Sequence, residues 1–156
     1  MSLEPNSEIV LVTEKPVAGG RMLARHDGQV VLVAGAIPGE RVRARVERVS
    51  RQLAFAHTID VLDRSPDRRD GTVDWACGGS LYAHINYTRQ LALKAELIAD
   101  GLARIGKIHL AQTVPVMPSA EDGYRVRARL HIRNGRLGFF GKALRKSTTL
   151  KRRPKW

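Results

Sequence analysis

Short apolar runs separated by turn signals fill the first 64 residues of the chain. The runs cover residues 8–13, 21–25, 30–33, 41–47 and 53–61. The fourth run alternates Val or Ala with Arg at every second position. A period of two is typical of a strand with one buried face. In the fifth run, one face of such a strand would carry Leu53, Phe55, His57, Ile59 and Val61.

Two turn signatures support this interpretation. Asp27-Gly28 separates two apolar runs and is the strongest short-range signal for a hairpin. Pro38-Gly39 places Pro at position i+1 and Gly at position i+2 of a type II turn. Five short strands at this spacing predict a small antiparallel barrel, closed or partly closed. The OB-type barrel is a familiar nucleic-acid-binding example of this architecture.

The pattern changes after residues 64–71, where Pro, Gly and five charged residues without periodicity predict a linker. Between Thr88 and Ile105 apolar residues recur every three or four positions, which predicts an amphipathic helix. Gly106 is placed to end that helix as its C′ residue. The apolar positions of the helix are Leu91, Ala95, Ile98, Leu102 and Ile105.

Alternation returns at 124–133 and predicts a further strand, and Asn134-Gly135 predicts a hairpin with residues 136–140. Residues 141–156 show neither period, and their composition predicts disorder. The sequence therefore predicts a mainly β protein with an α+β part. Its three parts are an OB-like barrel at 1–64, a small α+β segment at 65–140 and a disordered basic tail at 141–156.

The charge balance favours a polyanionic partner such as nucleic acid. The 156 residues carry 27 Lys and Arg against 15 Asp and Glu, a formal net charge of +12. Seven of these basic residues lie at 141–156, where there is no acid, so the remainder of the chain is mildly basic. No apolar stretch approaches the ~20 residues that cross a bilayer, and the first residues lack the features of a signal peptide. We therefore expect a cytoplasmic protein with no membrane partner.

Two series of alternating arginines are the candidate nucleic-acid contacts. Guanidinium groups two positions apart on a strand lie roughly 6.6 Å from one another, close to the spacing of successive phosphates along a single strand. The same pattern is also typical of the solvated side of a half-buried strand. The residues are Arg41, Arg43 and Arg45 in the first half and Arg125, Arg127, Arg129 and Arg133 in the second.

Single-strand binders also use aromatic side chains on which bases stack. The candidates here are few, and we expect several of them in the core instead. They are Phe55, Trp75, Tyr82, Tyr87, Tyr124, Phe139 and Phe140.

Catalytic and metal chemistry find little support in the residues. Cys77 precedes two glycines, but a nucleophilic thiol needs a base or a helix N-terminus beside it, and His84 is a candidate base only by proximity. Cys77 is the only cysteine, so no internal disulfide is possible. The histidines, at positions 26, 57, 84, 109 and 131, have no metal-ligand spacing. Because a GxGxxG turn is also missing, we expect no catalytic residue, no metal site and no cofactor on this chain.

Three blocks of the sequence resemble a known family. The stretch 19–46, GGRMLARHDGQVVLVAGAIPGERVRARV, closely resembles the TRAM domain, a small RNA-binding barrel. The later blocks resemble, in the right order, the segments that follow in RNA (uracil-5-)-methyltransferases, and the resemblance covers about residues 8–140. These blocks are Cys77-Gly78-Gly79 with Tyr82, His84, Tyr87, Gln90 and Lys94, then Gly123-Tyr124-Arg125 with Arg127-Ala128-Arg129, and Gly138-Phe139-Phe140.

The resemblance implies the RNA-binding part of such an enzyme, with ribosomal or transfer RNA as its partner. It also implies S-adenosylmethionine as the cofactor of the full-length family. Many members hold an iron–sulfur cluster on four cysteines. Gly71 and Ser80 stand at two of those positions and only Cys77 remains, so we expect no iron–sulfur cluster.

The family's methyl-donor domain, with its nucleophilic cysteine and general-base glutamate, lies beyond the last matching block. Residues 141–156 resemble nothing in the family, and we expect a truncated or frameshifted chain that is inactive alone. Three alternatives stay open. They are a stand-alone TRAM-type RNA-binding protein, part of a split enzyme completed by a second, methyltransferase-domain chain, and a remnant without a selected function.

Overall fold

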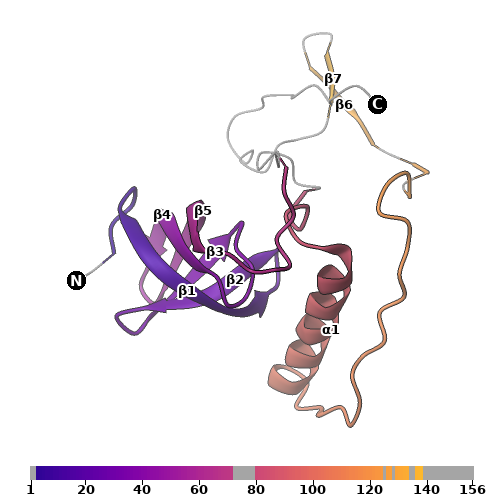
Figure 1. Ribbon diagram of the computed structural model, residues 1–156, viewed down its shortest axis with the longest axis horizontal. Helices are drawn as coiled ribbons and strands as arrows, with labels where there is room; N and C mark the ends of the chain where they lie inside the picture. Colours follow the sequence, from indigo (N-terminus) through magenta and orange to yellow (C-terminus); the bar gives the residue numbers. More distant parts are fainter. Residues whose placement is uncertain (1–2, 72–79, 125, 128, 134–135, 139–156) are drawn as a thin grey trace.

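Five strands closed into a barrel dominate the structure, and one long helix follows them (Figure 1). The computed structural model describes residues 3–71, 80–124, 126–127, 129–133 and 136–138. These strands match the five runs of the sequence and confirm the OB-like barrel. They are β1 (Glu8–Val17), β2 (Arg21–His26), β3 (Gln29–Ala34), β4 (Arg41–Ser50) and β5 (Leu53–Asp63).

The strand order around the barrel is β1-β2-β3-β5-β4, and β4 pairs back onto β1. All neighbouring strands are antiparallel except β3 and β5, which are parallel. The expectation of a purely antiparallel barrel is therefore wrong. The reason is the closure: β1 and β3 run in one direction, and β5 is two antiparallel pairings away from β1 through β4, so it meets β3 in parallel.

The two predicted turns have the expected backbone geometry. Asp27 and Gly28, between β2 and β3, have φ angles of 46° and 81°, as a type I′ hairpin turn requires. Gly39 has a φ of 90°, and the Glu40 N–H donates to the Ile37 carbonyl oxygen at 3.1 Å. That hydrogen bond closes the type II turn predicted at Pro38-Gly39. Both predictions are confirmed.

Small aliphatic side chains fill the interior of the barrel. Val42, Ala44 and Val46 point inward from alternate positions of β4 and have no solvent exposure. The same cluster of buried side chains continues beyond the barrel to Ile85 and Leu93. Burial of this aliphatic surface is the main favourable term for the fold.

Strand β5 turns its alanines inward. Ala54 and Ala56 are fully buried, whereas Phe55 is half-buried and Ile59 is exposed. The apolar face expected for this strand is therefore the outer face, and Val61 leaves it to pack against the core. Ala54 and Ala56 face inward because they pair in regular register with buried valines of β3. Val61 changes face because the register of β5 against β4 shifts between Arg43 and Ala44.

The helix α1 (Tyr87–Arg104) matches, within one residue at each end, the helix expected from Thr88 to Ile105. Its buried residues are Leu93 and Ala95. Of the apolar positions predicted for this helix only Ala95 is buried, whereas Ile98 is exposed. Within the described parts of the chain, no helix has the length and hydropathy of a membrane span.

The residue that follows Gly106 takes the left-handed conformation at the end of α1. Gly106 follows the C-cap residue Ile105 and is therefore the C′ residue, as predicted, while the positive φ of 56° belongs to Lys107. A Cβ atom at Gly106 would lie 2.9 Å from the carbonyl oxygen of Leu102. Glycine is therefore required at this position by space.

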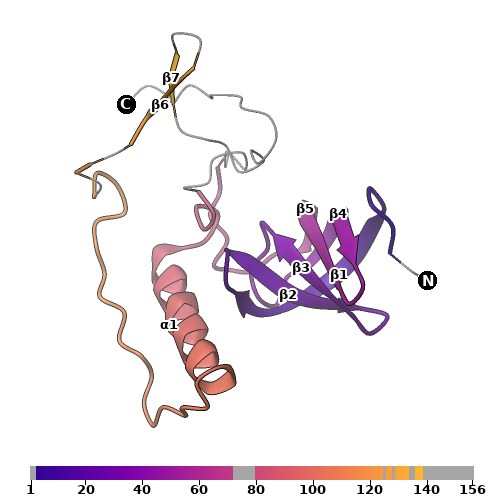
Figure 2. The same cartoon turned by 180° about the vertical axis from the view of Figure 1, so that it is seen from behind.

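A small hairpin lies away from the barrel. It consists of β6 (His131–Arg133) and β7 (Arg136–Gly138), which pair antiparallel around residues outside the described part. Both views show it reached by a long stretch that runs beside α1 on the side away from the barrel (Figures 1 and 2). The predicted strand over 124–133 is thus wrong for the described residues before His131. A strand needs a neighbour for its backbone groups, and this stretch pairs with none in the described structure.

Candidate nucleic-acid interface

The first arginine series points outward from β4, as its alternation with buried residues predicted. Each guanidinium, however, has a carboxylate partner on a neighbouring strand. Nitrogen-to-oxygen distances of 2.6–2.7 Å join these pairs, and all six side chains are substantially exposed. The pairs are Arg41–Asp63, Arg43–Asp60 and Arg45–Glu8.

These ion pairs form a neutral ladder across β5, β4 and β1. Hydrogen bonds to Asp63 and Asp60 raise the pKa of Arg41 and Arg43, so both remain fully charged. Two exposed valines of β1, at 50% and 54% exposure, pair in register with the same two arginines. A phosphate at the ladder would therefore compete with a carboxylate for the guanidinium group, which is feasible because exposed ion pairs are weak.

The second arginine series is not assembled on one strand. Arg127 and Arg129 are exposed and belong to no strand, and Arg133 ends the three-residue β6. Arg125 lies outside the described residues. The face of four aligned guanidinium groups expected from the sequence is therefore wrong for the described members of the series.

Phe55, one of the stacking candidates named from the sequence, lies in a cluster with two arginines that the sequence did not single out. Phe55 lies on the outer face of β5, and the guanidinium carbon of Arg48 is 3.8 Å from the centroid of its ring. The guanidinium carbon of Arg21 is 5.3 Å from the same centroid. Both distances are within the range of a cation–π interaction. The available signal was that Phe55 is the only aromatic residue among the first 64.

Arg21 and Arg48 differ in how they are held. Arg21 donates to the carbonyl oxygens of Leu32 and Ala56 at 3.1 and 2.7 Å, and to the Glu47 carboxylate at 2.7 Å. Arg48 is exposed, and no carboxylate of the described residues lies within ion-pair distance of it. One cation is thus fixed in the wall of the barrel, and the other keeps its charge on the surface.

Strand register extends the cluster into a row across the barrel. Leu23 pairs with Leu32, Leu32 with Phe55, and Phe55 with Arg48, so one outward residue from each of β2, β3, β5 and β4 lines up. The first three are half-buried and Arg48 is exposed. In OB-type barrels the face of strands 2 and 3 is a common nucleic-acid surface.

A groove opens at the end of this face, where the β2–β3 and β4–β5 turns meet. Polar groups there include Gln29, whose side-chain nitrogen lies 3.5 Å from the Ser50 carbonyl oxygen. Arg51 contributes a second exposed cation without a carboxylate partner among the described residues. The groove is lined by Leu3, Gly28, Gln29, Val30, Val49, Ser50, Arg51 and Gln52.

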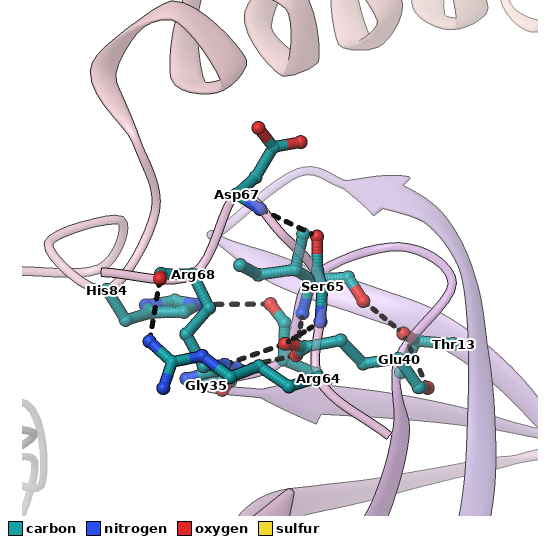
Figure 3. Close-up of polar contacts among 10 residues, drawn as sticks. Thr13, Gly35, Glu40, Arg64, Ser65, Asp67, Arg68 and His84 are labelled. Atoms are coloured by element: carbon teal, nitrogen blue, oxygen red, sulfur yellow. Dashed lines mark hydrogen bonds and ion pairs between the residues drawn. The ribbon is translucent and has the colours of Figure 1, made fainter. Parts of the chain in front are cut away.

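A buried ion pair attaches the segment after β5 to the barrel (Figure 3). The carboxylate of Glu40 has no solvent exposure, and the Arg68 side chain, 11% exposed, donates to both of its oxygens at 2.6 and 2.7 Å. The backbone N–H groups of Ile37 and Ser65 complete the carboxylate's hydrogen bonds. Arg68 also donates to the Gly35 carbonyl oxygen at 2.8 Å. The segment expected to be a linker is therefore docked on the barrel.

The residues that carry the methyltransferase-like block make structural contacts. The Nε2 atom of the buried His84 lies 3.0 Å from the carbonyl oxygen of Ala36, which directs this ring to the barrel (Figure 3). Burial raises the pKa of Tyr82, which packs against the core. Gln90 donates to the Ile85 carbonyl oxygen at 2.9 Å. Cys77 lies outside the described residues, so a pairing of His84 with that thiol stays untested.

Tyr87 joins the helix to the stretch that runs back beside it. Its hydroxyl accepts a hydrogen bond from the Ser119 N–H at 2.7 Å, and its contact with the Ser119 side chain lowers the pKa of the phenol. Among the described residues, no group of three His, Cys, Asp or Glu side chains is arranged to hold a metal ion.

Comparison with known proteins assigns the class of the barrel. Residues 8–59, which span β1 to most of β5, match the TRAM domain. An "uncharacterized RNA methyltransferase" of Aquifex aeolicus is 36% identical over 133 residues, 83% of this chain and 31% of that protein. A similarly described protein of Bdellovibrio bacteriovorus is 33% identical over 87% of this chain and 35% of its own length.

A named enzyme is also among the relatives. The 23S rRNA (uracil(1939)-C(5))-methyltransferase RlmD of Methylococcus capsulatus is 34% identical over 83% of this chain and 30% of its own length. The chain thus carries a TRAM domain, and its homologues include RNA (uracil-C5) methyltransferases, as the resemblance predicted. It spans about a third of the length of these relatives.

Proposed function

We propose that this chain binds RNA through the outer surface of its TRAM barrel, as the RNA-binding part of an RNA (uracil-5-)-methyltransferase. The observation that carries the proposal is the TRAM domain in a chain homologous to rRNA methyltransferases. The net charge of +12 and the exposed cations of β4 and its turn support it. Ribosomal RNA is the partner class favoured by the names of the relatives, with transfer RNA as the alternative, and the cytoplasm is the location that either partner implies.

The arginine ladder of β4 is proposed to contact phosphates. Arg41, Arg43 and Arg45 face solvent at alternate positions, and each guanidinium keeps donors beyond those used by its carboxylate partner. A sugar–phosphate backbone laid along β4 would exchange part of these contacts for its own. We extend the proposal to Arg125, Arg127, Arg129 and Arg133 as non-specific phosphate contacts, each acting separately.

Methyl transfer is stated by the names of the relatives, and we propose that another part of the enzyme performs it, in the same chain or in a second one. The described residues do not fit S-adenosylmethionine: α1 begins at Tyr87 after a turn and a single bridge at Ile85, and its first turn has no glycine to hold a nucleotide. We propose no iron–sulfur cluster on this chain, because such a cluster needs four thiolates and Cys77 is the only thiol of the sequence.

The test compares RNA binding by two double variants of the full chain. Arg43→Ala with Arg45→Ala removes two ladder cations, whereas Arg64→Ala with Arg104→Ala removes two exposed, ion-paired arginines elsewhere. Fluorescence anisotropy with a short single-stranded RNA at several salt concentrations measures affinity. The ladder variant is expected to bind several-fold more weakly, with its salt slope reduced by about 1.4 for two lost phosphate contacts.

The matched control has the same net charge, so general electrostatics predicts equal losses in both variants. Equal losses, or an unchanged affinity in the ladder variant, would remove the ladder from the interface. Absence of RNA binding by the unmodified chain would contradict the proposed function itself.

A further inference from the structure

We propose that Phe55 and Arg48 form a stacking site for one unpaired RNA base, at the centre of the outer row that runs from Leu23 to Arg48. This inference rests on the proposed RNA binding and adds to it the kind of RNA that is bound. A base on this site must expose its face, so the partner is a single strand, a loop or a bulge.

The placement of Phe55 indicates a role on the surface. Its sequence neighbours Ala54 and Ala56 are fully buried, so β5 fills the interior with methyl groups and presents its one aromatic ring outward. An aromatic ring buries a large apolar area when it is placed inside a core. Here that area is left partly accessible, in register with Leu32 on β3.

The charge of Arg48 is the second observation. The three ladder arginines on the same strand each have a carboxylate partner within 2.7 Å, but no described carboxylate is within ion-pair distance of Arg48. Its guanidinium is held instead over the Phe55 ring at 3.8 Å. The protein therefore presents a positioned, un-neutralised planar cation on an aromatic support.

These two groups match the chemistry of a nucleotide. Bases stack on aromatic rings and on arginine guanidinium planes, and this interaction is tolerant of sequence because every base has a π face. A base that extends the stack on Arg48, or takes its place on Phe55, brings its phosphate near the cation. Arg51, Gln29 and Ser50 in the adjoining groove supply a further cation and polar groups for the neighbouring nucleotide.

The experiment uses the full chain and three RNA probes: a short oligouridylate, the same strand with one abasic residue at its centre, and a duplex of matched length. The variants are Phe55→Leu, Phe55→Tyr and Arg48→Ala. Ile59→Ala, an exposed apolar residue of the same strand, is the control. Far-UV circular dichroism on heating verifies the fold of each variant.

Phe55→Leu and Arg48→Ala are expected to weaken binding of the oligouridylate by roughly five-fold to a hundred-fold, the range of one base stack. Phe55→Tyr and Ile59→Ala should bind like the unmodified chain. Phe55→Leu removes no charge, so its salt slope should stay unchanged. The unmodified chain should prefer the oligouridylate to the duplex and lose affinity for the abasic strand, a loss that Phe55→Leu should abolish.

The outcomes separate the two proposals. If the ladder variant weakens binding but Phe55→Leu and Arg48→Ala do not, RNA binding stands and the stacking site is wrong. Equal affinity of the unmodified chain for duplex and single strand also overturns the stacking site. If Phe55→Leu fails to fold, the surface substitution Arg48→Ala and the abasic probe on the unmodified chain decide it.

Discussion

Glu40 is a carboxylate without any exposure to solvent, and its surroundings explain how the barrel tolerates it. Burying a charge is costly unless it is paired and hydrogen-bonded. Two nitrogens of Arg68 and two backbone N–H groups donate to its oxygens, at 2.6–3.1 Å. The Glu40 side chain thereby ties the turn before β4 to the segment after β5.

Removal of Arg68 should lower the stability of the protein, because Glu40 would then be buried without its ion-pair partner. Arg68→Ala leaves Glu40 with a buried, unpaired charge, and we expect the free energy of unfolding to fall by about 3 kcal/mol. Urea unfolding followed by circular dichroism measures this change. The control is Arg64→Ala, four residues earlier, whose ion pair with Asp70 is exposed and should contribute little.

The double variant Arg68→Ala with Glu40→Gln tests the cause. Because Gln is neutral, the double variant should lose less stability than Arg68→Ala alone. A larger loss in the double variant, or equal small losses for Arg68→Ala and Arg64→Ala, would show that the pair is not a buried electrostatic link.

At the level of elements, glycine is needed for the backbone conformation of a turn, whereas inside a helix it lowers stability. Gly39 has a φ of 90°, and a Cβ placed there would meet no atom within 4 Å, so any strain on substitution comes from the backbone alone. Gly101 lies within α1 without a positive φ, and it too has open space around it. The two positions therefore isolate conformation from packing.

Substitution by alanine should change stability with opposite sign at these positions. Gly39→Ala is expected to lower the free energy of unfolding by about 1–3 kcal/mol, because alanine is strained in the left-handed region. Gly101→Ala should raise it by about 0.5–1 kcal/mol, since glycine is a poor helix former. Thermal unfolding of both variants measures this, and a loss of stability in Gly101→Ala would contradict the assignment of open helical surface.

Elements that depend on a short stretch of sequence could be predicted, whereas strand pairings that depend on closure of the barrel could not. Asp27-Gly28 and Pro38-Gly39 determine their turns through their own backbone preferences. The parallel pairing of β3 with β5 depends on where β4 closes the barrel, which no local pattern encodes. The helix was predictable in extent, but its buried face was shifted to Leu93 by what it packs against.

The candidate site divides in the same way. Alternation with buried residues correctly predicted that Arg41, Arg43 and Arg45 face outward. Their carboxylate partners lie on β5 and β1 and are brought beside them by the register of the strands. The sequence alone therefore could not predict that these arginines are ion-paired. Phe55 faces outward because its neighbours Ala54 and Ala56 pair with buried valines of β3, and this pairing is set by barrel closure.

At the scale of the whole molecule, the barrel and the helix share one core. Ile85 and Leu93 are fully buried in the cluster that fills the barrel, and Lys15 of β1 contacts Asp100 of α1 at 2.7 Å. The division into 1–64, 65–140 and 141–156 expected from the sequence stays a proposal. A barrel prepared alone would need residues to Arg68 at least, because Glu40 depends on that side chain.

The Lys15–Asp100 contact gives the link between barrel and helix a pH dependence. Hydrogen bonds from Lys15 and Arg104 hold the pKa of Asp100 below its ordinary value of 3.8. Such a carboxylate stabilises the folded state above its unfolded pKa, and this contribution is lost as the pH falls through the lower, folded-state pKa. Asp100→Asn should therefore lower the melting temperature at neutral pH.

Melting curves followed by circular dichroism from neutral to acid pH would measure the difference. The gap between Asp100→Asn and the unmodified chain should close as the pH falls below 3.8. Asp122→Asn, a carboxylate beyond the helix, serves as the control. A gap that persists unchanged in acid would mean that the carboxylate charge is not what joins the two elements.

Closure of the barrel by β1 and β4 also dictates when the protein can fold during its synthesis. Strand β1 is synthesised first, yet one of its two partners, β4, is synthesised only after the β2–β3 hairpin. Strand β3 likewise lacks its partner β5 until the end of the barrel sequence. Such non-local pairing slows folding, and the nascent strands have open edges until the last one arrives. Since Glu40 then still lacks Arg68, we expect the barrel to reach its full stability only when the chain has grown past that arginine.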